Sequence, residues 1–330
     1  MSAGTPLVSI CIPTYNREAS VMRAVASALG QTYEPIEVVV VDDASTDDTC
    51  AKLRALDDVR LRIHRNARRL GQIANRNRAI KLCQGELVKF LDSDDTLELD
   101  CVELMATALR ERHTVGLAFC RRRLVTDAEP SPAVKRWVAE YGDLQAPIVP
   151  LGPLIDGPEL LSRWIADGLA RNWIGEPTAV MARRGAILAC GGFDPRTRLR
   201  CDLGLWARIM AHHDVTFIDR ELVNYQVGIG GESETSASLR GNGSWLDRLW
   251  VLEALSAVEM VDESVPELRA ARAGARREAW RIALKLGRSY GQRYPLSPYA
   301  GYLLARAQAL AGRRQAMSPA PMLDTRDHAR

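Results

Sequence analysis

The stretch IEVVVVDDASTDDT, residues 36–49, indicates how this sequence folds. Its apolar run is typical of a strand that is buried on both faces, and Asp42 and Asp43 follow it directly. A helix is expected to run from this acidic turn to about Leu56. Strands buried on both faces occur mainly where helices cover both sides of a sheet. The stretch therefore predicts an α/β fold with a mostly parallel, twisted sheet and helices on both faces.

Strand and helix patterns continue to alternate along the chain. Strands are expected at LVSICI (7–12), ELVKFL (86–91) and TVGLAFC (114–120), with a more exposed strand at VRLRIHR (59–65). In such sheets, ligands bind beyond the carboxyl ends of the strands. The polar clusters PTYN, DDAS and DSDD stand at three of these ends. We therefore expect all three clusters to face one crevice.

Composition sets bounds on the class of protein. The chain has 330 residues, 47% of them hydrophobic, which suffices for one large domain or two smaller ones. A net charge of +3 is too small to indicate a nucleic-acid binder. Seven scattered cysteines fit free thiols in a reducing compartment, and no secretory signal or long apolar run is seen. We expect a cytoplasmic protein.

The acidic cluster LDSDD is the strongest chemical signal in the sequence. Asp92, Asp94 and Asp95 crowd at a strand end, and hard carboxylate oxygens suit Mg²⁺ or Mn²⁺. The alternative is that these acids only cap the following helix. One cap needs one acid rather than three, so we favour a cation site.

For Asp42 and Asp43, capping and nucleotide binding remain equally good interpretations. The segment PTYNREAS is not a glycine-rich dinucleotide loop, which argues against a dehydrogenase.

Together these motifs resemble the N-terminal half of family-2 glycosyltransferases of the GT-A fold. The resemblance rests on VSICIPTYN, VVVVDDASTDDT and NRNRAIKLCQGELVKFLDSDD, and GGFDPRTRLRCDLGLWARI (191–209) resembles the family's acceptor-side segment. It implies an inverting transferase that uses a nucleotide-diphosphate sugar, a UDP-sugar above all, and a divalent metal. The carrier of the acceptor hydroxyl, whether glycan, lipid or small molecule, is left open.

The resemblance also implies roles for single residues. The expected nucleotide-sugar contacts are Pro13, Tyr15, Asp43, Arg76, Asn77, Asp92, Ser93 and Asp94. Asp94 and Asp95 would hold the metal, and Asp202 would be the general base. Two departures stand out: Cys201 replaces the acid that usually precedes the base, and Gly228 stands where relatives often carry a histidine.

The acceptor side is expected to include Gly192 and the rings of Trp173 and Trp206, whereas Trp137 and Trp164 are expected to pack in the core.

We predict a nucleotide-sugar half (1–115), an acceptor half of the same domain (116–244), a helical extension (245–314) and a disordered tail (315–330). A basic amphipathic helix near 277–288 is interpreted as a solvated face. The alternative is peripheral contact with the inner face of a membrane.

Two other functions compete with this prediction. A catalytically silent sugar-nucleotide-binding module is compatible with Cys201 and Gly228. A sugar nucleotidyltransferase would need a phosphate loop rich in glycine and arginine after the first strand, and PTYNREAS is not one.

Overall fold

The computed structural model describes residues 4–126, 129–167, 169, 171–197 and 200–227. All of them belong to the first of two compact units, residues 1–275. The predictions for Gly228, the helical extension, its basic helix and the tail concern residues outside the described part. No described helix is long and apolar enough to cross a membrane.

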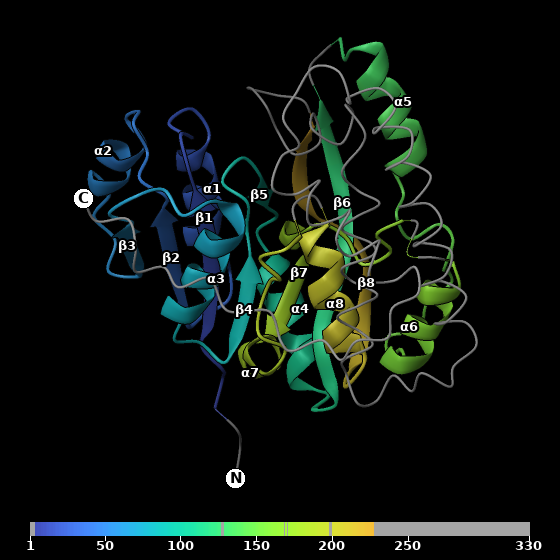
Figure 1. Ribbon diagram of the computed structural model, residues 1–330. Coiled ribbons are helices and arrows are strands. Elements are labelled where there is room, and N and C mark those ends of the chain that lie inside the picture. The colour runs from blue at the N-terminus through green and yellow to red at the C-terminus, as the bar shows by residue number, and fades with distance from the viewer. Residues whose placement is uncertain (1–3, 127–128, 168, 170, 198–199, 228–330) are drawn as a thin grey trace, which may run out of the picture. The chain divides into compact units, whose positions relative to one another are not determined.

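The core of the first unit is an eight-stranded sheet with the order β3-β2-β1-β4-β7-β6-β8-β5 (Figure 1). The strands are β1 (Val8–Thr14), β2 (Ile36–Asp42), β3 (Leu61–Arg65), β4 (Leu87–Phe90), β5 (Thr96–Leu97), β6 (Val115–Thr126), β7 (Val180–Arg183) and β8 (Asp214–Val227). Neighbours in the β3-β2-β1-β4 half are parallel, as are β6 and β8, whereas β7 runs antiparallel between β4 and β6. The predicted mostly parallel α/β sheet is confirmed.

Helices cover both faces of this sheet, because successive strand residues point to opposite sides. They are α1 (Val21–Leu29), α2 (Thr49–Arg54), α3 (Gln72–Leu82), α4 (Cys101–Arg110), α5 (Pro132–Tyr141), α6 (Gly157–Ala166), α7 (Arg184–Ala189) and α8 (Cys201–Met210). In β2, Val38 and Val40 pack in the core that contains α1 and α4. Val39 and Val41 pack in the core that contains α3 and α8. The valine run thus fills two cores at once.

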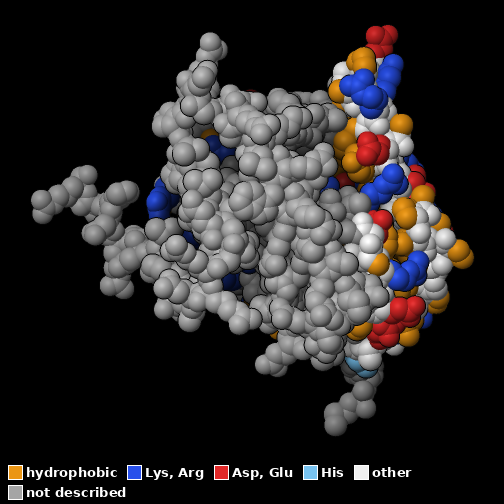
Figure 2. Space-filling model, turned by 45° about the vertical axis from the view of Figure 1, so that its right-hand side comes forward, with side chains coloured by type: hydrophobic (Ala, Val, Ile, Leu, Met, Phe, Trp, Pro, Cys, Tyr) orange, Lys and Arg blue, Asp and Glu red, His pale blue; other side chains and the backbone are white. Residues whose placement is uncertain are grey.

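Many prolines and the lack of a clear period predict an irregular excursion over residues 121–160, but the structure is more regular there. Strand β6 continues to Thr126 because it pairs with β8 as far as Val227. Proline-rich stretches then give way to α5 and α6, which are capped by the side chains of Ser131 and Asp156. Figure 2 shows that the surface around these two helices mixes hydrophobic side chains with charges of both signs.

The path of the chain between α3 and β4 depends on one glycine. A Cβ atom at Gly85 would lie 2.5 Å from the Leu7 carbonyl oxygen, so no larger residue fits beside β1. The Gly85 N–H donates to the Ser9 hydroxyl at 2.8 Å. This close approach starts β4 in parallel register beside β1 and brings the carboxyl ends of both strands to one edge.

Candidate functional site

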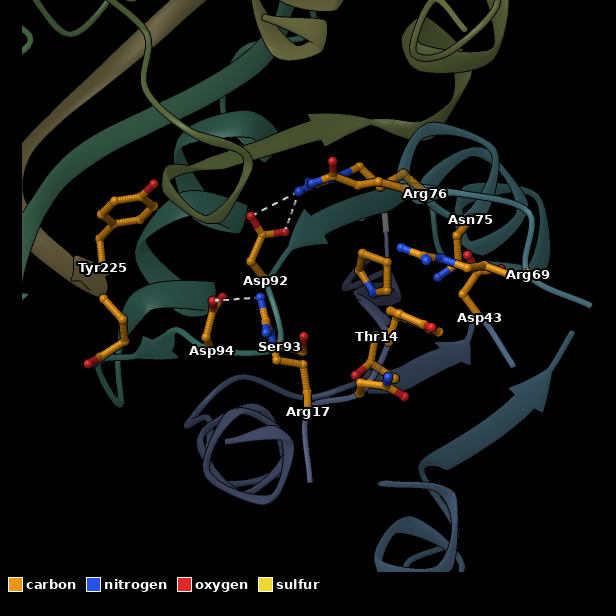
Figure 3. Close-up of a pocket in the computed structure, with 15 residues that line it drawn as sticks. Thr14, Arg17, Asp43, Arg69, Asn75, Arg76, Asp92, Ser93, Asp94 and Tyr225 are labelled. Carbon is orange, nitrogen blue, oxygen red and sulfur yellow. Dashed lines mark hydrogen bonds and ion pairs between the residues drawn. The ribbon is translucent and has the colours of Figure 1, made fainter. Parts of the chain in front are cut away.

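A cavity of about 430 Å³ lies at the carboxyl ends of β1, β2 and β4 (Figure 3). Its size falls within the usual range of small-molecule sites. The lining residues are Pro13, Thr14, Tyr15, Asn16, Arg17, Asp43, Arg69, Gln72, Asn75, Arg76, Asp92, Ser93, Asp94, Tyr225 and Gln226. Every predicted nucleotide-sugar contact is among them except Asn77. The structure therefore brings PTYN, DDAS and DSDD to one crevice.

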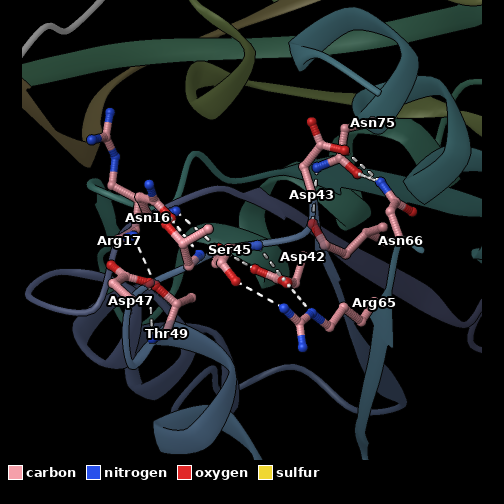
Figure 4. A network of polar contacts seen from close by, with 12 residues as sticks. Asn16, Arg17, Asp42, Asp43, Ser45, Asp47, Thr49, Arg65, Asn66 and Asn75 are labelled. Carbon is pink, nitrogen blue, oxygen red and sulfur yellow. Dashed lines mark hydrogen bonds and ion pairs between the residues drawn. The ribbon is translucent and has the colours of Figure 1, made fainter. Parts of the chain in front are cut away.

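Asp43, at the end of β2, holds the loop that leads into α3 (Figure 4). Its Oδ1 accepts hydrogen bonds from the Asn66 amide and the Leu70 N–H, both at 2.7 Å. Its Oδ2 accepts one bond, from the Gly71 N–H at 2.8 Å, and so keeps acceptor capacity toward the cavity.

Neither acid after β2 caps the next helix. Asp42 is fully buried, accepts from the Ser45 N–H and pairs with Arg65 at 3.3 Å. Helix α2 begins at Thr49, and its N-cap residue, Asp48, makes no side-chain capping hydrogen bond. The capping alternative is therefore wrong at this turn, where the acids stabilise loops around the cavity.

Tyr15 offers its ring to the cavity, but a cation lies against that ring. The Arg69 guanidinium carbon is 3.9 Å from the ring centroid, a cation–π geometry. Sequence reasoning missed Arg69, Gln72 and Asn75. The only available signal was the polar segment NARRLGQIAN, which leads from β3 into α3.

The acidic cluster divides into groups with different partners. Arg76 Nη2 lies 2.9 Å from Oδ1 and 3.0 Å from Oδ2 of Asp92, which compensates that charge. Asp94 lies 3.5 Å from the Arg17 guanidinium and lines the cavity. Burial, and then the Asp92 carboxylate, raise the pKa of Asp94. A cation beside Asp94 would relieve both effects.

Asp95 points into the protein rather than into the cavity. It is 1% exposed, and it accepts hydrogen bonds from the Thr178 hydroxyl at 2.6 Å and the Gln226 N–H at 2.9 Å. Burial raises its pKa well above the usual range, and the Asp94 and Asp92 carboxylates add to the rise. Its two internal hydrogen bonds argue against the predicted role of Asp95 as a metal ligand. No group of three metal-binding side chains occurs in the described ranges.

Thr178 is a structural residue of this site that the sequence did not reveal. It is fully buried, and its hydroxyl accepts from the Asp92 N–H at 3.0 Å while it donates to Asp95. Its carbonyl oxygen accepts from the buried Lys89 ammonium group. The turn that carries the acidic cluster is thus fastened to the segment before β7.

Asp202 lies in the first turn of α8 and is 8% exposed. The Asn172 amide donates to its Oδ2 at 2.7 Å, and the Leu203 N–H donates to its Oδ1 at 2.9 Å. Burial, and then the Glu176 carboxylate, raise the pKa of Asp202 to about 7. A carboxyl with that pKa can take up a proton near neutral pH.

Several residues predicted to bind ligands have structural roles instead. Trp206 is fully buried against Phe90 and Phe193, so it has no exposed ring face for a sugar. Trp173 is 6% exposed and stacks on Trp164.

Asn77 and Gly192 likewise belong to an internal contact. Asn77 exchanges two hydrogen bonds of 2.8 Å with the backbone of Phe193. Gly192 has φ +73°, and a Cβ atom there would lie 2.6 Å from the Asn77 Oδ1. This pairing docks the segment GGFD on α3, so we assign neither residue to a ligand.

Comparison with solved structures defines the class of fold. A Staphylococcus aureus TarS structure in complex with UDP-GlcNAc superimposes with a TM-score of 0.59 at 22% identity, covering 91% of this chain and 79% of that one. The mannosyltransferase PcManGT of Pyrobaculum calidifontis, in complex with GDP-Man and Mn²⁺, gives 0.50 at 20% identity, covering 93% and 80%. The protein has the GT-A glycosyltransferase fold.

Sequence comparison then identifies the family. The family model described as glycosyl transferase family 2 matches residues 9–145. The putative teichuronic acid biosynthesis glycosyltransferase TuaG of Bacillus subtilis is 30% identical over 217 residues, 64% of this chain and 74% of that protein. The chain belongs to family 2 of the glycosyltransferases.

Other relatives are matched over a smaller share of their length. An uncharacterized Mycobacterium tuberculosis protein is 36% identical over 66% of each chain. The Escherichia coli glucosyltransferase WfaP, which uses UDP-Glc and α-D-GlcNAc-diphosphoundecaprenol, is 43% identical over 27% of this chain and 36% of its own. The chain thus spans about two thirds or less of the length of these two relatives.

Proposed function

We propose that this protein is an inverting glycosyltransferase that moves a sugar from a UDP-sugar to an acceptor hydroxyl, with Asp202 as the general base. The proposal rests on the environment of Asp202. It is a buried carboxylate, fixed by Asn172, whose pKa of about 7 suits proton uptake. Arg76 links Asp202 to the cavity. Its guanidinium pairs with Asp92, which lines the cavity, and its positive charge lowers the pKa of Asp202.

The proposed reaction is a single displacement. The acceptor oxygen forms a bond to the anomeric carbon while the bond from that carbon to the diphosphate breaks. Asp202 takes the hydroxyl proton, and the nucleoside diphosphate leaves with the bonding electrons. Attack from the face opposite the leaving group inverts the anomeric centre.

The donor pocket is proposed to be the cavity at the strand ends. Asp43 would accept a hydrogen bond from the base through its free Oδ2 capacity, and Arg76 and Arg69 would face the phosphates. The names of the relatives support a UDP-sugar, because TarS was solved with UDP-GlcNAc and WfaP uses UDP-Glc. GDP-Man in PcManGT makes a guanosine donor the competing outcome.

We propose a divalent cation, Mn²⁺ or Mg²⁺, at Asp94. One carboxylate suits a cation that is otherwise held by substrate phosphates and water, rather than by a complete protein cage. When bound, the cation would neutralise charge that develops on the leaving diphosphate. Asp92, already paired with Arg76, would orient the donor.

The test uses the purified chain with UDP-glucose, UDP-N-acetylglucosamine and GDP-mannose. Thermal shift identifies the bound donor, and release of nucleoside diphosphate measures slow hydrolysis. Asp202→Asn should lower hydrolysis at least about 100-fold without weakening nucleotide binding. Glu159→Gln, on the exposed side of α6, is the matched control and should change neither. Equal rates in Asp202→Asn and wild type would refute the base, and binding without turnover would indicate a silent module.

A further inference from the structure

The turn of residues 172–176, NWIGE, is fastened to two positions of α8. The Asn172 amide donates to Asp202 Oδ2 at 2.7 Å, and the Trp206 indole N–H donates to the Gly175 carbonyl at 3.0 Å. Positions 202 and 206 are four residues apart, on one face of the helix. Within the turn, Asn172 and Gly175 exchange two further hydrogen bonds. The turn is therefore built against the first turn of α8.

Glu176 is the last residue of this turn, and its two carboxylate oxygens differ in their contacts. One of its oxygens pairs with the Arg122 guanidinium. Its Oε2 is buried and accepts no hydrogen bond in the described part of the chain. Arg122, in turn, donates to the Tyr141 carbonyl oxygen and lies over the Tyr225 ring. Packing on both sides thus holds Glu176 in place.

Among the described residues, Glu176, Arg76 and Arg200 are the charged side chains that act most strongly on Asp202 besides its burial. Glu176 favours the protonated form of the base, whereas Arg76 and Arg200 favour the ionised form. The neighbouring position, 201, carries no acid. Cys201 is 3% exposed and packs in the hydrophobic core beneath α8. The carboxylate that acts on Asp202 therefore comes from another segment of the chain, the turn of residues 172–176.

We propose that Asn172 and Glu176 are positioning residues for Asp202, and that Glu176 supplies from the neighbouring turn the second carboxylate that Cys201 does not provide. This inference rests on the proposed role of Asp202 as base. Asn172 fixes the orientation of the carboxylate, so that its remaining lone pairs face the acceptor hydroxyl. Glu176 maintains the proton affinity that the base needs.

The direct test is a pH titration of the Asp202 carboxyl by carbon-13 NMR of aspartate-labelled protein, with Asp202→Asn to assign the signal. Glu176→Gln keeps the shape of the side chain and removes its charge, so the titration midpoint should fall by about one pH unit. Glu176→Asp should keep the wild-type midpoint. Glu159→Gln, which removes an exposed charge on α6, should leave the midpoint unchanged. An unchanged midpoint in Glu176→Gln would overturn the role proposed for Glu176.

Loss of the Glu176 charge leaves the Arg122 cation less well paired, which can impair folding. A double variant, Glu176→Gln with Arg122→Met, removes both charges at similar volume and should lower the midpoint in the same way. The NMR titration does not depend on turnover, so it separates this inference from the proposed function. Hydrolysis unaffected in Asp202→Asn would refute the base, whereas an unmoved midpoint refutes only Glu176.

Asn172 is tested by kinetics. Asn172→Ala removes the hydrogen bond to Asp202 Oδ2 and should lower kcat for UDP-sugar hydrolysis about tenfold, with KM unchanged. A change in KM alone would indicate that Asn172 contributes to donor binding, which would contradict its role in positioning Asp202. Unchanged kcat and KM would also contradict it.

Discussion

Replacing Thr178 with valine should loosen the turn that carries the acidic cluster. The substitution keeps the branched shape in a site with no solvent exposure but removes the hydroxyl. Two hydrogen bonds disappear together. The Asp92 N–H loses its acceptor at 3.0 Å, and the Asp95 carboxyl loses a donor at 2.6 Å.

The magnitude follows from these two contacts. A hydrogen bond contributes roughly 0.5–1.5 kcal/mol, and an N–H left without a partner costs about 1–3 kcal/mol. Part of this cost is relieved when water or a shifted side chain replaces the hydroxyl. We expect Thr178→Val to lower the free energy of unfolding by about 3 kcal/mol, a large share of the 5–15 kcal/mol typical of a folded domain.

The assay is urea denaturation, together with calorimetric titration of UDP. UDP affinity should fall because Asp92 and Asp94 lie on the loosened turn. Thr178→Ser retains the hydroxyl and should cost about 1 kcal/mol for the lost methyl group, with UDP affinity kept. Thr216→Val removes a single bond to the Pro153 carbonyl and should cost about 1 kcal/mol without affecting UDP. Equal unfolding free energies for Thr178→Val and Thr216→Val would refute the reasoning.

Three further predictions concern pH, metal and backbone. Because the pKa of Asp202 is about 7 and only the ionised form is a base, kcat/KM should fall about tenfold per pH unit below 7; a limb near pH 4 in the rate profile would contradict this. Asp94→Asn should abolish the gain in UDP affinity on adding Mn²⁺, measured by calorimetry with and without chelator. Gly192→Ala should lower unfolding free energy by about 1–3 kcal/mol because its Cβ would strike Asn77, whereas Gly185→Ala, in open space on α7, should not destabilise.

Much of the β3-β2-β1-β4 half of the sheet could be predicted because its signals are local. The apolar runs of β1, β2 and β4 must be buried on both faces, and that requirement alone implies a parallel sheet with helices on both sides. Parallel strands share a carboxyl edge, which is why Tyr15, Asp43 and Asp94 line one cavity. These signals are strong because a continuous apolar run of strand length, without polar alternation, indicates burial on both faces with no reference to distant residues.

The roles of the tryptophans and of Asp95 could not be predicted in the same way. Trp206 and Asp95 each belong to a sequence segment, residues 191–209 and the cluster LDSDD respectively, that is predicted to form part of the site. Which way a side chain turns, however, depends on partners distant in sequence: Phe193 and Phe90 around Trp206, Thr178 beside Asp95. No periodicity records such contacts.

The sequence by itself determined the α/β class, the edge of the sheet where the cavity lies and the acids that stand on it, because strand burial and strand direction follow from local composition. Only the tertiary structure decided which of those acids face the cavity and which hold the protein together. It also placed Glu176 near Asp202, although the two are far apart in the chain. The physical reason is that the proton affinity and orientation of a carboxylate depend on burial and neighbouring charges, which arise when distant segments pack.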